Sequence, residues 1–110
     1  MYLGEIDPEY TPTLDGVVVA LCADYPRRQS FIEKGGLSKR CEMEYKYLNY
    51  KILEAACEVT DDRLARILIK DIGDKVGYAY TEAYYLSEST YKRQKREVKI
   101  NIAKKLHLGV

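Results

Sequence analysis

The chain has 110 residues, of which 46% are hydrophobic and 32% are charged, and its formal net charge is +1. These totals are typical of one small, folded, soluble domain. No apolar run approaches the about 18 residues that span a bilayer, and the first ten residues lack the basic and apolar regions of a signal peptide. We therefore expect a cytoplasmic protein without a membrane partner.

Residues that carry chemistry are sparse. His107 is the only histidine, and Cys22, Cys41 and Cys57 lie far apart among apolar residues in helical patterns. Reduced, packed thiols are the expectation. No spacing for a zinc site, phosphate-binding loop or nucleophile elbow occurs. The sequence therefore predicts no enzyme activity, no metal and no cofactor.

The first 36 residues predict an irregular lead-in and two helical segments. Thr11 is a suitable N-cap with Pro12 at the first helical position, and apolar residues recur at helical spacing over about 12–24. The run "VVVAL" leaves a short strand as an alternative, although no partner strand is apparent. Pro26 kinks this helix or starts a second segment capped by Asp24, which the Gly35–Gly36 turn ends.

The middle of the chain predicts two amphipathic helices. Ser38 is a plausible N-cap for a long helix over about 39–59, whose apolar stripe includes Tyr45 and Ile52. Thr60, followed by two aspartates, suits the start of another helix, because hydroxyl caps and carboxylates favour the positive end. Gly73 is the expected end of that helix.

The last part predicts a short helix at roughly 76–84, a tight connection, and a long helix at about 88–106 capped by Ser87. A short helix, a turn and a second helix with an exposed basic face describe a helix-turn-helix. The predicted fold is all-α, with five or six helices and a C-terminal helix-turn-helix. We expect one compact domain, in which residues 1–59 form an N-terminal helical segment with a dimer or partner surface and residues 60–110 form the helix-turn-helix DNA-binding segment.

The positive charge is concentrated on the long C-terminal helix. Residues 91–105 hold seven basic residues and one acidic residue, so the rest of the chain carries net negative charge. With about 100° between successive residues, Tyr91, Val98 and Ile102 form one buried stripe, and the basic arc faces away from it. Such segregation suits phosphate contacts and readout of guanine edges, although a basic face is often only a solvated face.

The stretch "YLSESTYKRQKREV" resembles the recognition-helix entry of phage late-gene transcription regulators of the ArpU and RinA type, and more distantly sigma-factor region 4. The similarity covers about 60–108. It implies that Ser87 caps the recognition helix and that Leu86 and Tyr91 fill the core. It also implies that Glu88, Ser89, Lys92, Arg93 and Arg96 face DNA. Lys99 of the basic arc and the Ser87 hydroxyl, which suits a phosphate oxygen, complete the predicted DNA-binding residues.

Outside the basic helix, two features have alternative interpretations. The eleven tyrosines can stack nucleic-acid bases, but packing at helix interfaces is favoured, and the Glu-rich cluster around Tyr45–Tyr50 suits a protein partner better. Arg27 and Arg28, with Lys39 and Arg40, bracket the Gly-Gly turn and suggest a second basic patch. Ordinary solvation is the favoured interpretation of these four.

The predicted function is a sequence-specific, duplex-DNA-binding transcriptional regulator of phage or prophage type. Double-stranded DNA is the expected partner, and the N-terminal helices are expected to contact a second subunit in a homodimer, or RNA polymerase, because one short helix reads few base pairs. The alternative is a helical protein-interaction module, such as an adaptor or anti-repressor.

Overall fold

The computed structural model describes residues 10–108, and all regular secondary structure in this part of the chain is helical, without a strand. The all-α prediction is confirmed, and "VVVAL" lies inside a helix. The helices are α1 (Pro12–Ala23), α2 (Tyr25–Lys34), α3 (Lys39–Cys57), α4 (Asp62–Asp74) and α5 (Glu88–Lys105), with a short 3-10 helix η1 (Tyr78–Tyr80). Residues 1–9 of the lead-in predicted at 1–10, and Gly109, lie outside the described residues.

Local signals set most of the helix starts. The side chains of Thr11, Ser38 and Ser87 each accept a hydrogen bond from the backbone N–H three residues ahead, as N-caps do. The predicted cap of α4 is wrong by one residue, because Asp61 Oδ1, and not Thr60, accepts from Leu64 N at 2.9 Å. A carboxylate at this position also complements the helix dipole.

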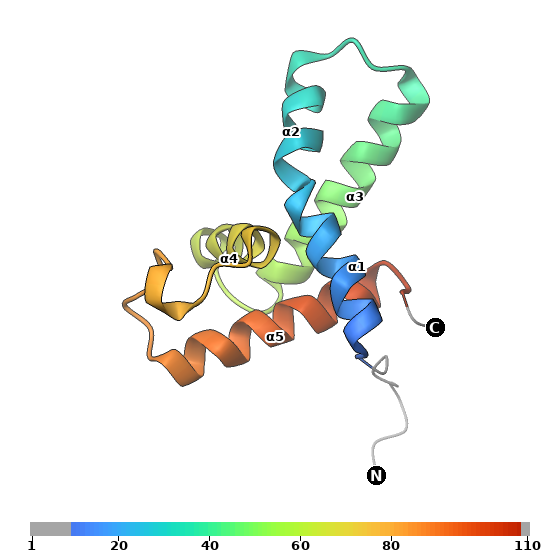
Figure 1. The fold of residues 1–110 in the computed structure, drawn as a ribbon. Coiled ribbons are helices and arrows are strands. Elements are labelled where there is room, and N and C mark those ends of the chain that lie inside the picture. The colour runs from blue at the N-terminus through green and yellow to red at the C-terminus, as the bar shows by residue number, and fades with distance from the viewer. Residues whose placement is uncertain (1–9, 109–110) are drawn as a thin grey trace.

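The α2–α3 hairpin extends away from the other helices, which cross one another below it (Figure 1). Gly35 and Gly36, both with positive φ, form the turn at its tip. The hairpin is held by a polar contact that the sequence did not predict: Arg28 is only 2% exposed, and its Nε donates to Asn49 Oδ1 at 2.7 Å. The interpretation of Arg28 as a solvated residue is therefore wrong.

One core joins helices from both halves of the chain. Its fully buried large side chains include Val18 of α1, Ile52 of α3, Leu68 and Ile72 of α4, and Tyr91 of α5. Tyr91 is 1% exposed, which confirms its predicted core position. Cys22 also packs there, whereas Cys57 is exposed, so the expectation of three packed thiols is wrong for Cys57.

The prediction that Gly73 ends α4 is wrong. Gly73 instead allows α1 to approach α4 closely. The helix continues to Asp74, and Lys75 adopts the left-handed conformation at its C-cap. A Cβ atom on Gly73 would lie 2.7 Å from Ala23 N and 2.8 Å from Ala23 Cα. The absence of a side chain therefore sets how closely α4 crosses the end of α1.

The predicted helix at 76–84 is not an α-helix. Residues 75–87 connect α4 to α5 and contain only η1. Thr81 has an extended backbone, its hydroxyl donates to the buried Asp71 Oδ2 at 2.5 Å, and Ala83 N donates to Thr81 Oγ1 at 3.0 Å. Tyr78 OH also donates a hydrogen bond to Leu86 O at 2.6 Å. These side-chain hydrogen bonds take the place of the backbone hydrogen bonds of a helix.

Candidate nucleic-acid interface

The N-terminal end of α5 is exposed and well capped. Ser87 Oγ accepts from Thr90 N at 3.3 Å and also donates to Thr90 Oγ1 at 2.9 Å, with Ser89 Oγ at 3.4 Å. Glu88 lies in the first turn, where a carboxylate favours the helix dipole. Hydroxyls and unpaired backbone N–H groups at a helix start are suitable partners for a phosphate oxygen.

Six of the seven predicted DNA-facing residues are exposed at the N-terminal part of α5, whereas Tyr91, Val98 and Ile102 of the same helix are buried. These exposed residues are Ser87, Glu88, Ser89, Lys92, Arg93 and Arg96. We call this set the basic face of α5. Its three cations, Lys92, Arg93 and Arg96, lie within about one and a half helical turns.

Lys99 does not belong to the basic face, which corrects the prediction for this residue. Its Nζ donates to Asp15 Oδ1 of α1 at 3.0 Å, and its side chain is only 23% exposed. The helical wheel placed Lys99 at the margin of the arc, and α1 packs at that margin. Lys99 therefore joins α5, near the C-terminus, to α1, near the N-terminus.

Two cations of the basic face have acidic neighbours on the same helix. Lys92 Nζ lies 3.6 Å from Glu88 Oε2, and Arg93 Nε lies 3.6 Å from Glu97 Oε1. All four side chains are more than half exposed. Exposed pairs of this kind contribute only about 0 to 1 kcal/mol, so a phosphate can compete for either cation.

Arg96 is held by an aromatic ring. Its guanidinium lies 5.8 Å from the centroid of the Tyr10 ring, and Tyr10 OH donates to Asp15 Oδ1 at 2.9 Å. The Tyr10 ring therefore helps to fix the direction of the Arg96 side chain, and Arg96 remains exposed to solvent. By contrast, Lys95 turns inward to Val76 O at 2.6 Å, and burial lowers its pKa.

Asp15 is expected to make the stability of the α1–α5 contact depend on pH. Partial burial disfavours its carboxylate, but hydrogen bonds from Lys99 and Tyr10 outweigh this and lower the pKa of Asp15 below its usual value. A lowered folded-state pKa gives stability above the unfolded pKa, about 3.9, which is lost as pH falls through the folded pKa.

Asp15→Asn should therefore reduce the free energy of unfolding by roughly 0.5–1 kcal/mol at pH 7, because the ion pair is partly exposed. The difference from the wild type should shrink as pH falls below about 3.9 and through the lowered pKa of Asp15, so pH 7 is compared with the lowest pH at which the protein stays folded. Urea denaturation at both pH values measures this. A difference that stays constant down to the lower pH would contradict the assigned role.

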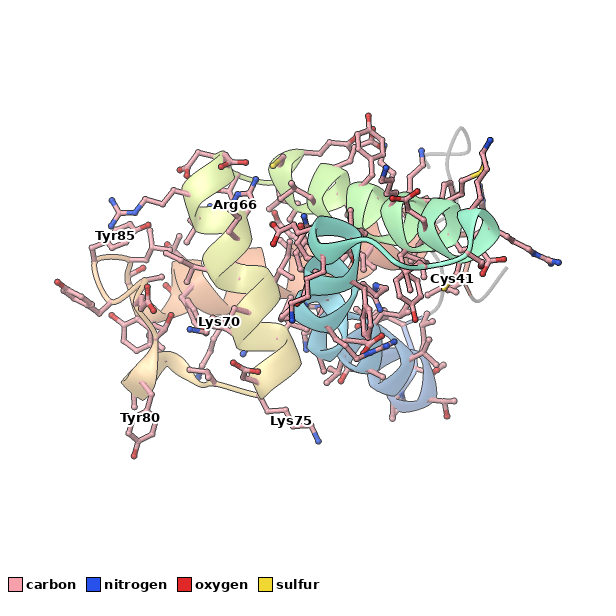
Figure 2. The ribbon with its side chains drawn as sticks, turned by 90° about the horizontal axis from the view of Figure 1, so that it is seen from above. Cys41, Arg66, Lys70, Lys75, Tyr80 and Tyr85 are labelled. Atoms are coloured by element: carbon pink, nitrogen blue, oxygen red, sulfur yellow. The ribbon has the colours of Figure 1, made fainter. Side chains whose placement is uncertain are left out.

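Three tyrosines beside the start of α5 are exposed, contrary to the packing interpretation. Tyr80, Tyr84 and Tyr85 are 87%, 76% and 54% exposed. Figure 2 shows Tyr80 and Tyr85 projecting from the end of the molecule beyond α4. The sequence shows that these tyrosines lie close together in the chain. It does not predict which way their side chains point, because the segment between α4 and α5 is irregular. They place aromatic surface next to the basic face.

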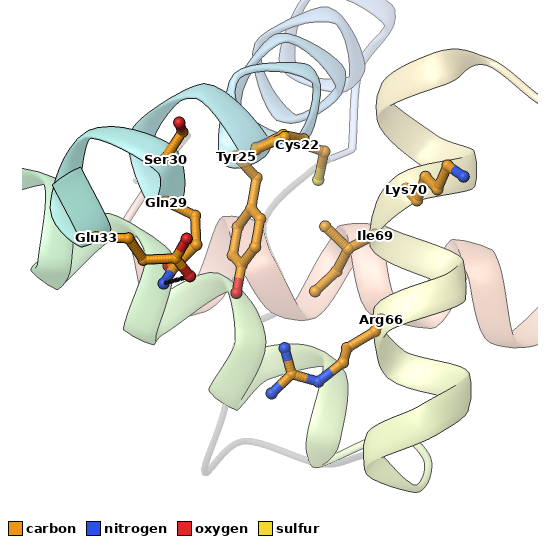
Figure 3. A pocket seen from close by; sticks show the side chains of 9 residues that line it. Cys22, Tyr25, Gln29, Ser30, Glu33, Arg66, Ile69 and Lys70 are labelled. Carbon is orange, nitrogen blue, oxygen red and sulfur yellow. Dashed lines mark hydrogen bonds between the residues drawn. The ribbon is translucent and has the colours of Figure 1, made fainter.

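A separate pocket of about 360 Å³ lies between α2 and α4 (Figure 3). Tyr25, Ile69 and Cys22 form its apolar part, and Glu33 and Arg66 lie at its rim. Burial raises the pKa of the Cys22 thiol to about 12, so this thiol is not a nucleophile at neutral pH. The lining residues come from α1, α2 and α4, so none of them is a predicted interface residue.

Within residues 10–108, no helix is long and apolar enough to cross a membrane, and no cluster of three or more His, Cys, Asp or Glu side chains is arranged to hold a metal ion. Comparisons with protein-family models, curated proteins and solved structures give no significant match to this chain. The resemblance to ArpU- and RinA-type regulators therefore stays a prediction.

Proposed function

We propose that the protein binds duplex DNA through the basic face of α5. The observation that carries this proposal is the exposure of Lys92, Arg93 and Arg96 together with Ser87 and Ser89, on a helix whose other side is anchored by Tyr91. Phosphates require exposed positive charge, and an α-helix fits the major groove, where arginine can read guanine.

In this proposal, the first helix of the helix-turn-helix is α4, and not the predicted helix at 76–84. Figure 1 shows α4 nearly along its axis while α5 lies across the view, and α4 packs on α5. Such steep crossing suits a helix-turn-helix pair, in which the first helix supports the helix that enters the groove. The connection at 75–87 is longer than the usual turn, and its exposed Tyr80 and Tyr84 add contact surface beside the groove.

In this proposal the protein is a transcriptional regulator of phage or prophage type. DNA binding by α5 leaves α2 and α3 available for a second subunit or RNA polymerase, because the hairpin extends away from α5 (Figure 1). The mechanism is binding alone: cations dock the helix on the backbone, and a few side chains select the sequence.

The test is the double change Arg93→Ala with Arg96→Ala. Both residues are exposed, so the fold should survive, whereas affinity for duplex DNA should fall. Each lost phosphate contact should reduce the slope of log affinity against log salt by about 0.9, and each lost guanine contact should cost about 1–3 kcal/mol. Fluorescence anisotropy with a randomised duplex library at several salt concentrations measures both effects.

The matched control is Lys34→Ala with Arg63→Ala, which removes the same charge from exposed positions on α2 and α4. This variant should keep a salt slope close to that of the wild type. The proposal fails if the wild type does not bind duplex DNA at low salt, or if the α5 variant binds with an unchanged slope.

A helical protein-interaction module, such as an adaptor or anti-repressor, is the second candidate. The observation that favours it is the exposed apolar surface on α3, where Met43, Tyr47 and Tyr50 are all more than half exposed. Apolar residues gathered in this way mark protein contacts more often than nucleic-acid contacts. This candidate predicts no duplex binding at any salt concentration.

A further inference from the structure

The outer face of α3 carries an apolar stripe without a partner in the described chain. Met43, Tyr47 and Tyr50 are 61%, 51% and 62% exposed. Their spacing of four and three residues places them within about 60° of one another on the helix. The opposite side of α3 packs on α2 and the core, where Asn49 and Ile52 are buried. We call the three residues the α3 stripe.

The rest of the described chain leaves this stripe open. The hairpin extends beyond the other helices (Figure 1). The helix α5 contacts α3 near the C-terminal end of α3. There, Lys105 Nζ lies 3.3 Å from Glu54 Oε1, and Asn101 Nδ2 donates to Ala55 O at 2.8 Å. Two helical turns of α3 before Glu54 are therefore available to another molecule.

We propose that the α3 stripe is the interface of a homodimer, in which two copies of α3 pack antiparallel about a two-fold axis at Tyr47. With a rise of about 1.5 Å per residue, this register brings Met43 of one copy within about 1.5 Å, along the axis, of the level of Tyr50 of the other. The two Tyr47 rings then meet at the centre. The inference goes beyond DNA binding and does not rest on it.

The charges beside the stripe are self-complementary in this register. Glu44 and Lys51 lie on the same flank of α3, and an antiparallel pair brings equal flanks together. Glu44 of each copy then lies within about 1.5 Å, along the axis, of the level of Lys51 of the other. Within one copy, Glu44 Oε1 lies 3.4 Å from Arg40 Nε and Lys51 Nζ lies 3.5 Å from Glu54 Oε1, so the contacts across the axis extend these pairs. Lys51 Nζ also lies 5.9 Å from the centroids of both the Tyr47 and Tyr50 rings. Two opposite-charge contacts therefore form, one at each end of the stripe.

The other flank is nearly neutral, because Lys46 has its own partner, Glu42, at 3.6 Å. A parallel dimer is disfavoured by the end of α5. Lys105 sits against Glu54 and Glu58, so parallel packing would bring the α5 ends of both copies to one level. Antiparallel packing instead places each α5 end beside the Gly35–Gly36 tip of the second copy.

The experiment is sedimentation velocity of the full chain, without DNA, over a concentration series. The wild type should form a reversible dimer. Tyr47→Lys should weaken it by about 100-fold or more, because the two-fold axis brings the new charges together. Glu44→Lys and Lys51→Glu should each weaken it about tenfold, and the two changes combined should restore it. Circular dichroism verifies that each variant folds.

A wild type that stays monomeric at several hundred micromolar overturns the proposal. So does a dimer that Tyr47→Lys leaves intact, or a charge-reversed pair that does not recover. The Arg93→Ala, Arg96→Ala variant should dimerise like the wild type, so loss of DNA binding and loss of dimerisation are separate results. Duplex binding by a monomeric wild type would overturn this interface alone.

Discussion

Tyr91→Ala should lower the free energy of unfolding by about 4 kcal/mol. The change removes a fully buried aromatic ring from the place where α4, η1 and α5 meet, and large-to-small changes of this kind cost about 3–5 kcal/mol. It also removes two hydrogen bonds. Tyr91 OH donates to Asp71 Oδ2 at 2.8 Å and contacts Val76 O at 3.2 Å.

Tyr91→Phe separates these two effects. The ring remains, and only the hydroxyl with its bonds to the buried Asp71 and to Val76 O is lost, which should cost about 1–3 kcal/mol. Urea denaturation of both variants measures the difference. Equal losses would mean that the Asp71 contact, not the ring, supplies the stability, and an unchanged midpoint for Tyr91→Ala would place the ring outside the core.

Gly73→Ala should destabilise the protein by about 2–3 kcal/mol, although alanine is the better helix former. The added methyl group would meet the backbone of Ala23 at under 3 Å, and backbone cannot rotate away as a side chain can. The helices α1 and α4 must therefore move apart and loosen the contacts of Val18 and Ile72 in the core.

Gly16→Ala is the matched control, because it makes the same substitution inside a helix where nothing lies within 4 Å. It should stabilise the protein by about 0.5–1 kcal/mol, through lower backbone entropy in the unfolded chain. Thermal melting of the two variants should therefore shift in opposite directions. Shifts of the same sign would show that α1 and α4 do not cross as closely as the structure indicates.

Local chemistry explains which parts of the fold the sequence predicts. The caps Thr11, Ser38 and Ser87 act on backbone groups three residues away, so their effect is visible in a short window. The start of α5 and the buried Tyr91 follow from the same local rules, since periodicity alone separates a buried stripe from an exposed one. The exposure of Lys92, Arg93 and Arg96 on the opposite side follows as well.

Long-range contacts explain what the sequence does not predict. Arg28 is buried because Asn49, 21 residues away, accepts its hydrogen bond, and Lys99 turns from the basic face because Asp15 lies 84 residues earlier. Residues 76–84 favour a helix locally, but Thr81 is held by Asp71 and cannot join one. A helical wheel gives the direction of a side chain and not the neighbour that it meets.

The pairing of α1 with α4 and α5 has a consequence for synthesis on the ribosome. The α2–α3 hairpin is joined by contacts between residues near one another in the chain, such as Arg28 and Asn49, so it can form early. The apolar side of α1, with Leu14 and Val18, finds its partners only after α4 and α5 have left the exit tunnel. Until then, the nascent chain exposes this side to chaperones.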